Sequence, residues 1–165
     1  MFQLKPLTKE AVGRALEKAE RYRLLDEPEQ AESICLDVLD VDPDDQRALV
    51  MLLLARTDRF MQRPSSPEGA LAILPRLRAP YDQAYYAGII QERRAMAAMA
   101  HATPGSDFAA YDLLRQAMAS YERAETIRPA GNDDSVLRWN TCARILNRNA
   151  QLRPRDEERS ELPLE

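Results

Sequence analysis

Histidine, lysine and glycine are scarce in this chain of 165 residues, which contains one histidine, three lysines and five glycines. The glycines are scattered from Gly13 to Gly131 and form no phosphate-binding cluster. The single histidine, His101, has no paired cysteine or serine nucleophile, and a favourable interaction with a helix end accounts for it. The acidic stretch 40–45 lacks the glycine and the distal glutamate of a calcium loop. The sequence therefore predicts a protein that is not an enzyme, with no catalytic, cofactor-binding or metal site.

The chain also has few cysteines and no long apolar run. The two cysteines, Cys35 and Cys142, are far apart and form no C-x-x-C pair, so we expect buried, reduced thiols. The longest apolar run is eight residues, 48–55, well below the roughly 18 that a membrane span needs. Charged residues interrupt the first ten positions, where a secretory signal would need an apolar stretch. A cytoplasmic protein without membrane insertion is the expectation.

Acidic residues outnumber basic residues in the chain, 27 to 23. The formal net charge is −4 and the pI is about 5.2, which is the wrong sign for a protein that neutralises a phosphate backbone. Nucleic acid is therefore not an expected partner.

Helical spacing of apolar residues occurs almost everywhere, and strand-like alternation occurs nowhere, so the sequence predicts an all-α fold. In the second predicted helix, Asp26 and Glu29 are placed as a capping box. In the fourth, Pro75 must kink or end the helix near Leu74. We expect one helical domain, 1–150, followed by a flexible tail, 151–165. About seven helices are predicted, at residues 8–24, 26–41, 44–61, 66–74, 81–101, 106–127 and 133–150.

Two segments of the chain have the same pattern before a proline. When ICLDVLDVDPDD (34–45) is aligned with SYERAETIRPAGND (120–133) by superposing Pro43 on Pro129, three apolar positions coincide. The aligned pairs are Cys35 with Tyr121, Val38 with Ala124, and Val41 with Ile127. The two segments are interpreted as copies of one repeated unit.

This pattern resembles the tetratricopeptide repeat (TPR) family, whose units are helix pairs of 34 residues that end in an aromatic or apolar residue, a small residue and a proline. The resemblance implies antiparallel helix pairs, stacked as a short right-handed superhelix, with the seventh helix capping the open end. It also implies that the first helix of each pair lines a concave groove that binds a peptide or a helix of a partner protein. The matching residues are Ala19, Tyr22, Ala31, Val38, Pro43, Ala117, Tyr121, Ala124 and Pro129.

Ten residues are predicted to face that groove when the repeat register is carried along the chain. They belong to the first, third, fifth and seventh helices and combine arginine, asparagine, acidic and apolar side chains. They are Glu20, Arg23, Arg47, Leu54, Asp58, Gln91, Arg94, Asn140, Arg144 and Asn147.

Two further features have open alternatives. Residues 48–55 are apolar on every side of the third helix, so this helix is either buried between neighbours or presents an apolar surface to a partner, which Met96, Met99 and Met118 could extend. The acidic and apolar ending ERSELPLE is either an inert, solubilising end or a segment that docks into a groove, of this protein or of another subunit.

The predicted function is a non-catalytic adaptor or scaffold that binds a protein or peptide in its concave groove. The alternative is a permanently bound structural or assembly subunit of a larger enzyme complex. The chain could also form a homo-oligomer. A third hypothesis, an all-α enzyme or small-ligand protein, would require a closed pocket with convergent polar groups.

Overall fold

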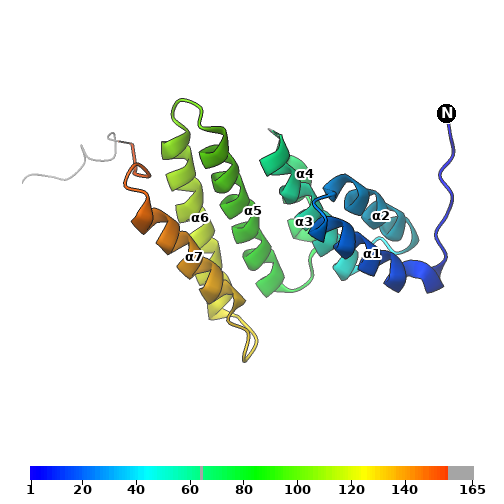
Figure 1. Cartoon of the computed structure of the whole chain (residues 1–165). Coiled ribbons are helices and arrows are strands. Elements are labelled where there is room, and N and C mark those ends of the chain that lie inside the picture. The colour runs from blue at the N-terminus through cyan, green and yellow to red at the C-terminus, as the bar shows by residue number, and fades with distance from the viewer. Residues whose placement is uncertain (64, 156–165) are drawn as a thin grey trace, which may run out of the picture. The chain divides into compact units, whose positions relative to one another are not determined.

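The computed structural model describes residues 1–63 and 65–155, and within them the fold is all-α, as predicted. The chain forms two compact units, Met1–Gln83 and Ala84–Glu165, each of which is described by itself. Figure 1 labels the helices. They are α1 (Val12–Leu24, preceded by a 3₁₀ turn at Lys9–Ala11), α2 (Pro28–Val41), α3 (Gln46–Gln62), α4 (Glu68–Leu71, followed by a 3₁₀ turn at Leu74–Arg76), α5 (Pro80–His101), α6 (Ser106–Thr126) and α7 (Asp134–Arg148).

In the first unit, α1 and α3 both pack against α2. Small side chains lie at the contacts: Ala19, Ala31 and Ala48 are fully buried, which lets the helices approach closely. Asp45 begins α3 by accepting a hydrogen bond from the backbone N–H of Ala48 at 2.9 Å.

Helix α3 is mostly buried. Leu49, Leu52 and Leu53 are at most 2% exposed, and α3 contacts α1, α2 and α4. Val50, Met51 and Leu54 are half-buried. The apolar run 48–55 was expected either to be buried between helices or to present an apolar surface to a partner. Most of its residues are buried within the first unit.

The predicted capping box at the start of the second helix is wrong. Helix α2 begins at Pro28, its N-cap residue is Glu27, and no side chain caps it. Proline suits this first position because its missing N–H has no helical acceptor there. Asp26 instead has a φ of 59° and follows the end of α1, a left-handed conformation that aspartate tolerates better than most residues. Its side chain accepts a hydrogen bond from Gln62.

The fourth predicted helix is shorter than expected. Helix α4 covers only Glu68–Leu71, and a separate 3₁₀ turn contains Pro75. The turn is fixed to the loop before α3, because Arg76 donates a hydrogen bond to the Pro43 carbonyl at 2.7 Å. Ile73 and Leu77 are buried on either side of the proline. The break that Pro75 imposes thus directs two apolar side chains into the first unit.

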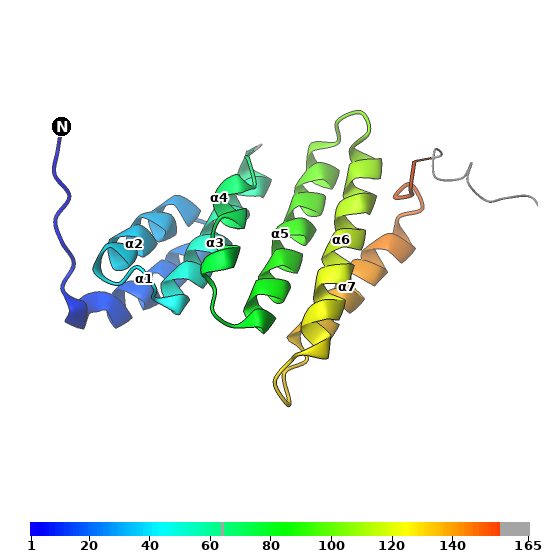
Figure 2. The ribbon, with the colours of Figure 1, turned by 180° about the vertical axis from the view of Figure 1, so that it is seen from behind.

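The second unit is built from most of α5 with α6 and α7 (Figures 1 and 2). Tyr121, Ala117 and Ala124 of α6, which carry part of the resemblance to the TPR family, are fully buried. Gly88 of α5 lies against the Tyr121 ring so closely that a Cβ at this position would be 2.4 Å from a ring carbon. The indole N–H of Trp139 connects α7 to α6 by donating to Glu122 at 2.9 Å.

The chain continues to contact the second unit after α7 ends. Leu152 is only 6% exposed, and the Arg155 guanidinium lies over the Phe108 ring of α6, 5.9 Å from its centre. Residues 156–165 lie outside the described residues. The predicted boundary between a domain, 1–150, and a flexible tail, 151–165, stays a prediction.

The close approach of Gly88 to Tyr121 gives a test of the second unit. Gly88→Ala should destabilise the protein by about 1–3 kcal/mol, the usual cost of overpacking, because neither the helix backbone nor the buried ring can give way freely. Gly13→Ala is the matched control, since its Cβ would meet nothing within 4 Å, and it should be neutral or stabilise α1 by up to about 1 kcal/mol. Urea denaturation followed by circular dichroism measures both. Equal midpoints for the two variants would contradict the packing described.

Candidate functional site

A buried carboxylate joins the three helices of the second unit. Glu92 of α5 is 5% exposed. One of its oxygens accepts a hydrogen bond from the Tyr121 hydroxyl at 2.6 Å, and the other accepts one from Arg138 of α7 at 3.1 Å. Tyr85 packs against the Tyr121 ring, with 5.8 Å between ring centres. Because both carboxylate oxygens are occupied, this cluster satisfies its own hydrogen bonds.

The titration properties of the cluster agree with a structural role. Burial, followed by the nearby Glu92 charge, raises the pKa of Tyr121 far above its usual value. Burial and the same charge raise the pKa of Cys142 to about 12. Partial burial lowers the pKa of Arg138, but Glu92 and a hydrogen bond with Tyr85 outweigh this and raise it. Neutral tyrosine, neutral thiol and charged arginine are therefore the states at neutral pH.

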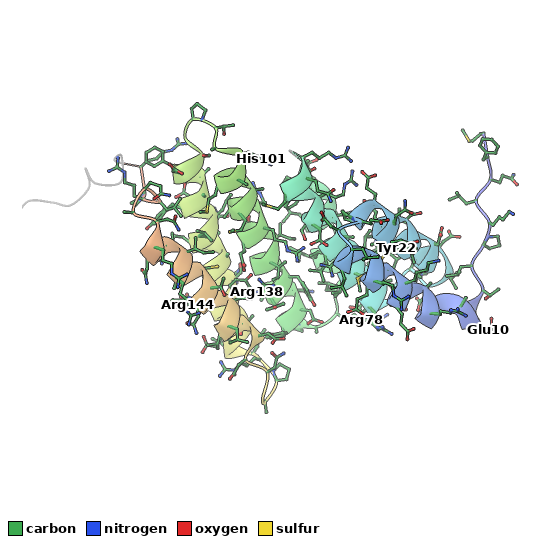
Figure 3. The ribbon with its side chains drawn as sticks, viewed as in Figure 1. Glu10, Tyr22, Arg78, His101, Arg138 and Arg144 are labelled. Carbon is green, nitrogen blue, oxygen red and sulfur yellow. The ribbon has the colours of Figure 1, made fainter. Side chains whose placement is uncertain are left out.

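A hollow of about 320 Å³ lies between α5 and α7. Met96 and Met99 of α5 and Ile145 of α7 are half-buried along it and form its apolar part. Arg144 and Arg148, one helical turn apart on α7, are exposed and give it a basic rim. We call this the α5–α7 hollow; Thr141 and Asn149 complete its lining. Figure 3 labels Arg144 and Arg138, both on α7. The volume of the α5–α7 hollow is at the lower end of the range for ligand pockets, about 300–1,000 Å³, so the hollow has room for a few side chains.

The rim arginines differ from most arginines of the first unit in lacking carboxylate partners. Within residues 1–63 and 65–155, neither Arg144 nor Arg148 forms an ion pair. In contrast, Arg56 and Arg59 both bind Glu32, at 2.9 and 2.7 Å. They line another hollow, in the first unit, together with Arg63, which pairs with Glu29. That hollow has its charges largely neutralised, whereas the α5–α7 hollow leaves two cations available to a ligand.

The ten residues predicted to face a groove divide equally between the two units. Arg23 and Asp58 bind each other, with Nε and Oδ2 at 2.7 Å, so they connect α1 to α3. Gln91 and Arg94 are hydrogen-bonded at 2.9 Å within α5. Arg144 lines the α5–α7 hollow with Met96 and Met99. Of the remaining five, Glu20, Arg47 and Asn147 are exposed and Leu54 and Asn140 are half-buried. One continuous groove that contains all ten stays a prediction.

Comparisons with protein-family models, with curated proteins and with solved structures found no match to this chain. Among the described residues, no group of three or more histidine, cysteine, aspartate or glutamate side chains is arranged to hold a metal ion. No described helix is both long and apolar enough to cross a membrane.

Sequence reasoning missed two parts of these sites. Arg148 follows Arg144 by four residues, so helical spacing could have added it to the rim. Glu92 was missed because a search for apolar periodicity passes over a carboxylate; the available signal was its position between buried Ile89 and Ala95. Its partners Tyr121 and Arg138 are 29 and 46 residues away in sequence, so only the folded chain reveals them.

Removing the buried carboxylate should cost much of the stability of the second unit. Glu92→Ala leaves the Tyr121 hydroxyl buried without an acceptor and Arg138 without its counter-charge, for an expected loss of about 2–3 kcal/mol. Glu125→Ala is the control, because it removes only a partly exposed pair with Arg128, with an expected loss below about 1 kcal/mol. Chemical denaturation measures both, and comparable losses would show that the Glu92 cluster contributes little.

Proposed function

We propose that this protein is a non-catalytic adaptor, built from divergent TPR-like helix pairs, that binds a short acidic and leucine-bearing segment of a partner protein in the α5–α7 hollow. The observation that carries the proposal is the combination of an apolar lining, Met96, Met99 and Ile145, with two arginines that have no carboxylate partner among the described residues.

Each part of the hollow favours this kind of ligand. Methionine side chains are flexible and polarisable, so they adapt to irregular apolar partners. Arginine presents a fixed fork of donors that matches a carboxylate. In a segment that has leucines beside carboxylates, the leucine side chains would be buried against the apolar lining. The carboxylates would pair with the arginines of the rim. The hollow is too small for the whole face of a helix, so a short extended segment is the better fit.

The rigid surroundings of the hollow support binding without chemistry. Glu92, Tyr121 and Arg138 hold α5, α6 and α7 together, so the helices that carry the methionines and arginines are positioned before a ligand arrives. Preorganisation of this kind lowers the entropy cost of association. Free cysteines Cys35 and Cys142 support a cytoplasmic setting, where thiols are kept reduced.

Binding of defined peptides tests the proposal. A fluorescent peptide with two leucines flanked by glutamates should bind the full chain, and the same peptide with lysines in place of the glutamates should not. Arg144→Glu should weaken binding of the acidic peptide at least about tenfold, or about 1.4 kcal/mol. The matched control is Arg115→Glu, an exposed arginine of α6, which should leave affinity unchanged. Fluorescence anisotropy at low salt measures these affinities.

Two results would contradict the proposal. One is equal binding of the acidic and basic peptides. The other is equal loss of affinity in the Arg144→Glu and Arg115→Glu variants, which would show attraction to net charge and not to the hollow.

A second candidate, a permanently bound subunit of a larger assembly, is supported by exposed leucines of the first unit. Leu24 and Leu25, at the end of α1, are 83% and 62% exposed, and Leu36 of α2 is 47% exposed. Large side chains of this kind are often covered by another chain in stable complexes.

Solution mass distinguishes the two candidates. An adaptor that meets its partner transiently should elute as a monomer of 18.8 kDa in light scattering. A subunit should be recovered in a larger complex, and Leu24→Ser with Leu25→Ser should release it. A monomer whose mass and solubility are the same in the double serine variant would exclude the subunit hypothesis.

A further inference from the structure

We propose that residues 156–165 of this same chain bind in the α5–α7 hollow, so that the protein occupies its own partner site until a competing segment displaces them. This inference rests on the proposed function and concerns the regulation of that site.

Charge complementarity is the first argument. Residues 84–155 contain ten arginines and seven carboxylates, a net charge of +3, and two of those arginines form the rim of the hollow. Residues 156–165, DEERSELPLE, contain five carboxylates and one arginine, a net charge of −4. The acidic residues 156–165 thus follow directly after residues 84–155, whose net charge is positive.

The apolar content of the segment matches the lining of the hollow. Leu162 and Leu164 are separated by one residue, so in an extended chain their side chains point to the same side. Pro163 between them disfavours a helical conformation for Leu162. An extended Leu-Pro-Leu could therefore place both leucines against Met96, Met99 and Ile145, while Glu161 and Glu165 lie at either end to meet the arginines.

The last described residues start the segment within reach of the hollow. Arg155 lies on Phe108 at the beginning of α6, which a short turn connects to the end of α5. Met99 lies in the last turn of α5. The seven residues from Arg155 to Leu162 can span up to about 25 Å. Asn149, which lines the hollow, precedes Arg155 by six residues and is therefore at most about 22 Å from it, so Leu162 can reach the hollow.

Tethering makes a weak contact effective. A short flexible connection gives an effective concentration on the order of 1 mM. If the untethered segment binds with a Kd of about 0.1 mM, about nine chains in ten are self-occupied at that concentration. A chain truncated after Arg155 should then bind the acidic leucine peptide about tenfold more tightly than the full chain.

The experiment places a spin label on the segment and detects the hollow through methionine methyl groups. Ser160→Cys provides one reactive thiol, because Cys35 and Cys142 are fully buried and burial raises the pKa of each to about 12. In the full chain, the label should broaden the methyl resonances of Met96 and Met99, assigned by Met→Leu substitutions. Arg144→Glu with Arg148→Glu should abolish the broadening. The matched control is Arg115→Glu with Arg123→Glu, two exposed arginines of α6, which should retain it.

Three outcomes would overturn the inference. The first is that Met96 and Met99 stay sharp in the labelled full chain. The second is that broadening survives reversal of the rim charges. The third is that broadening occurs equally between a spin-labelled chain and a separate isotope-labelled chain, which would make the occupant a second copy. If the first outcome is found while the acidic peptide still binds the truncated chain in an Arg144-dependent way, the inference fails and the proposed function stands.

Discussion

The hydrogen bonds of Glu92 are the interaction on which the second unit depends. A single carboxylate accepts from Tyr121 of α6 and from Arg138 of α7, so it joins three helices through two oxygens. A buried carboxylate without such partners would be expensive, because the desolvation of its charge would be uncompensated. Gly88 contributes by letting α5 approach the Tyr121 ring. This cluster helps to fix the positions of α5 and α7. It therefore contributes to the shape of the hollow between these two helices.

Arginine has two different uses in the two units. In the first unit, Arg23, Arg56 and Arg59 bind carboxylates of neighbouring helices, and their guanidinium groups help to hold the helices together. In the second, Arg138 does the same with Glu92, whereas Arg144 and Arg148, farther along α7, form no ion pair within the described residues. One helix thus uses its first half for packing and leaves its second half able to attract an anion.

The helices and most packing positions were predictable from the sequence, because apolar periodicity and proline positions are local properties. Tyr121 and Ala124 were identified by their alignment on Pro129 and Ala117 by the resemblance to the TPR family, and all three are fully buried. Pairing between distant residues was not predictable. Arg23 and Asp58 were both singled out, yet spacing could not show that they bind each other across α1 and α3. The error at Asp26 has a local origin, since its left-handed backbone and the preference of Pro28 for the first helical position both compete with the capping pattern.

The binding that we propose at the hollow is expected to be weak, because the charges of its rim are exposed. Solvent reduces each exposed ion pair to below about 1 kcal/mol, and salt screens such charges over about 8–10 Å. The arginines can therefore select an acidic segment but cannot hold it alone, and most of the affinity must come from side chains that cover Met96, Met99 and Ile145. A hollow of about 320 Å³ admits only a few such side chains. Under the proposed function, a site of this strength suits a tethered segment, and a free partner would need additional contacts to displace it.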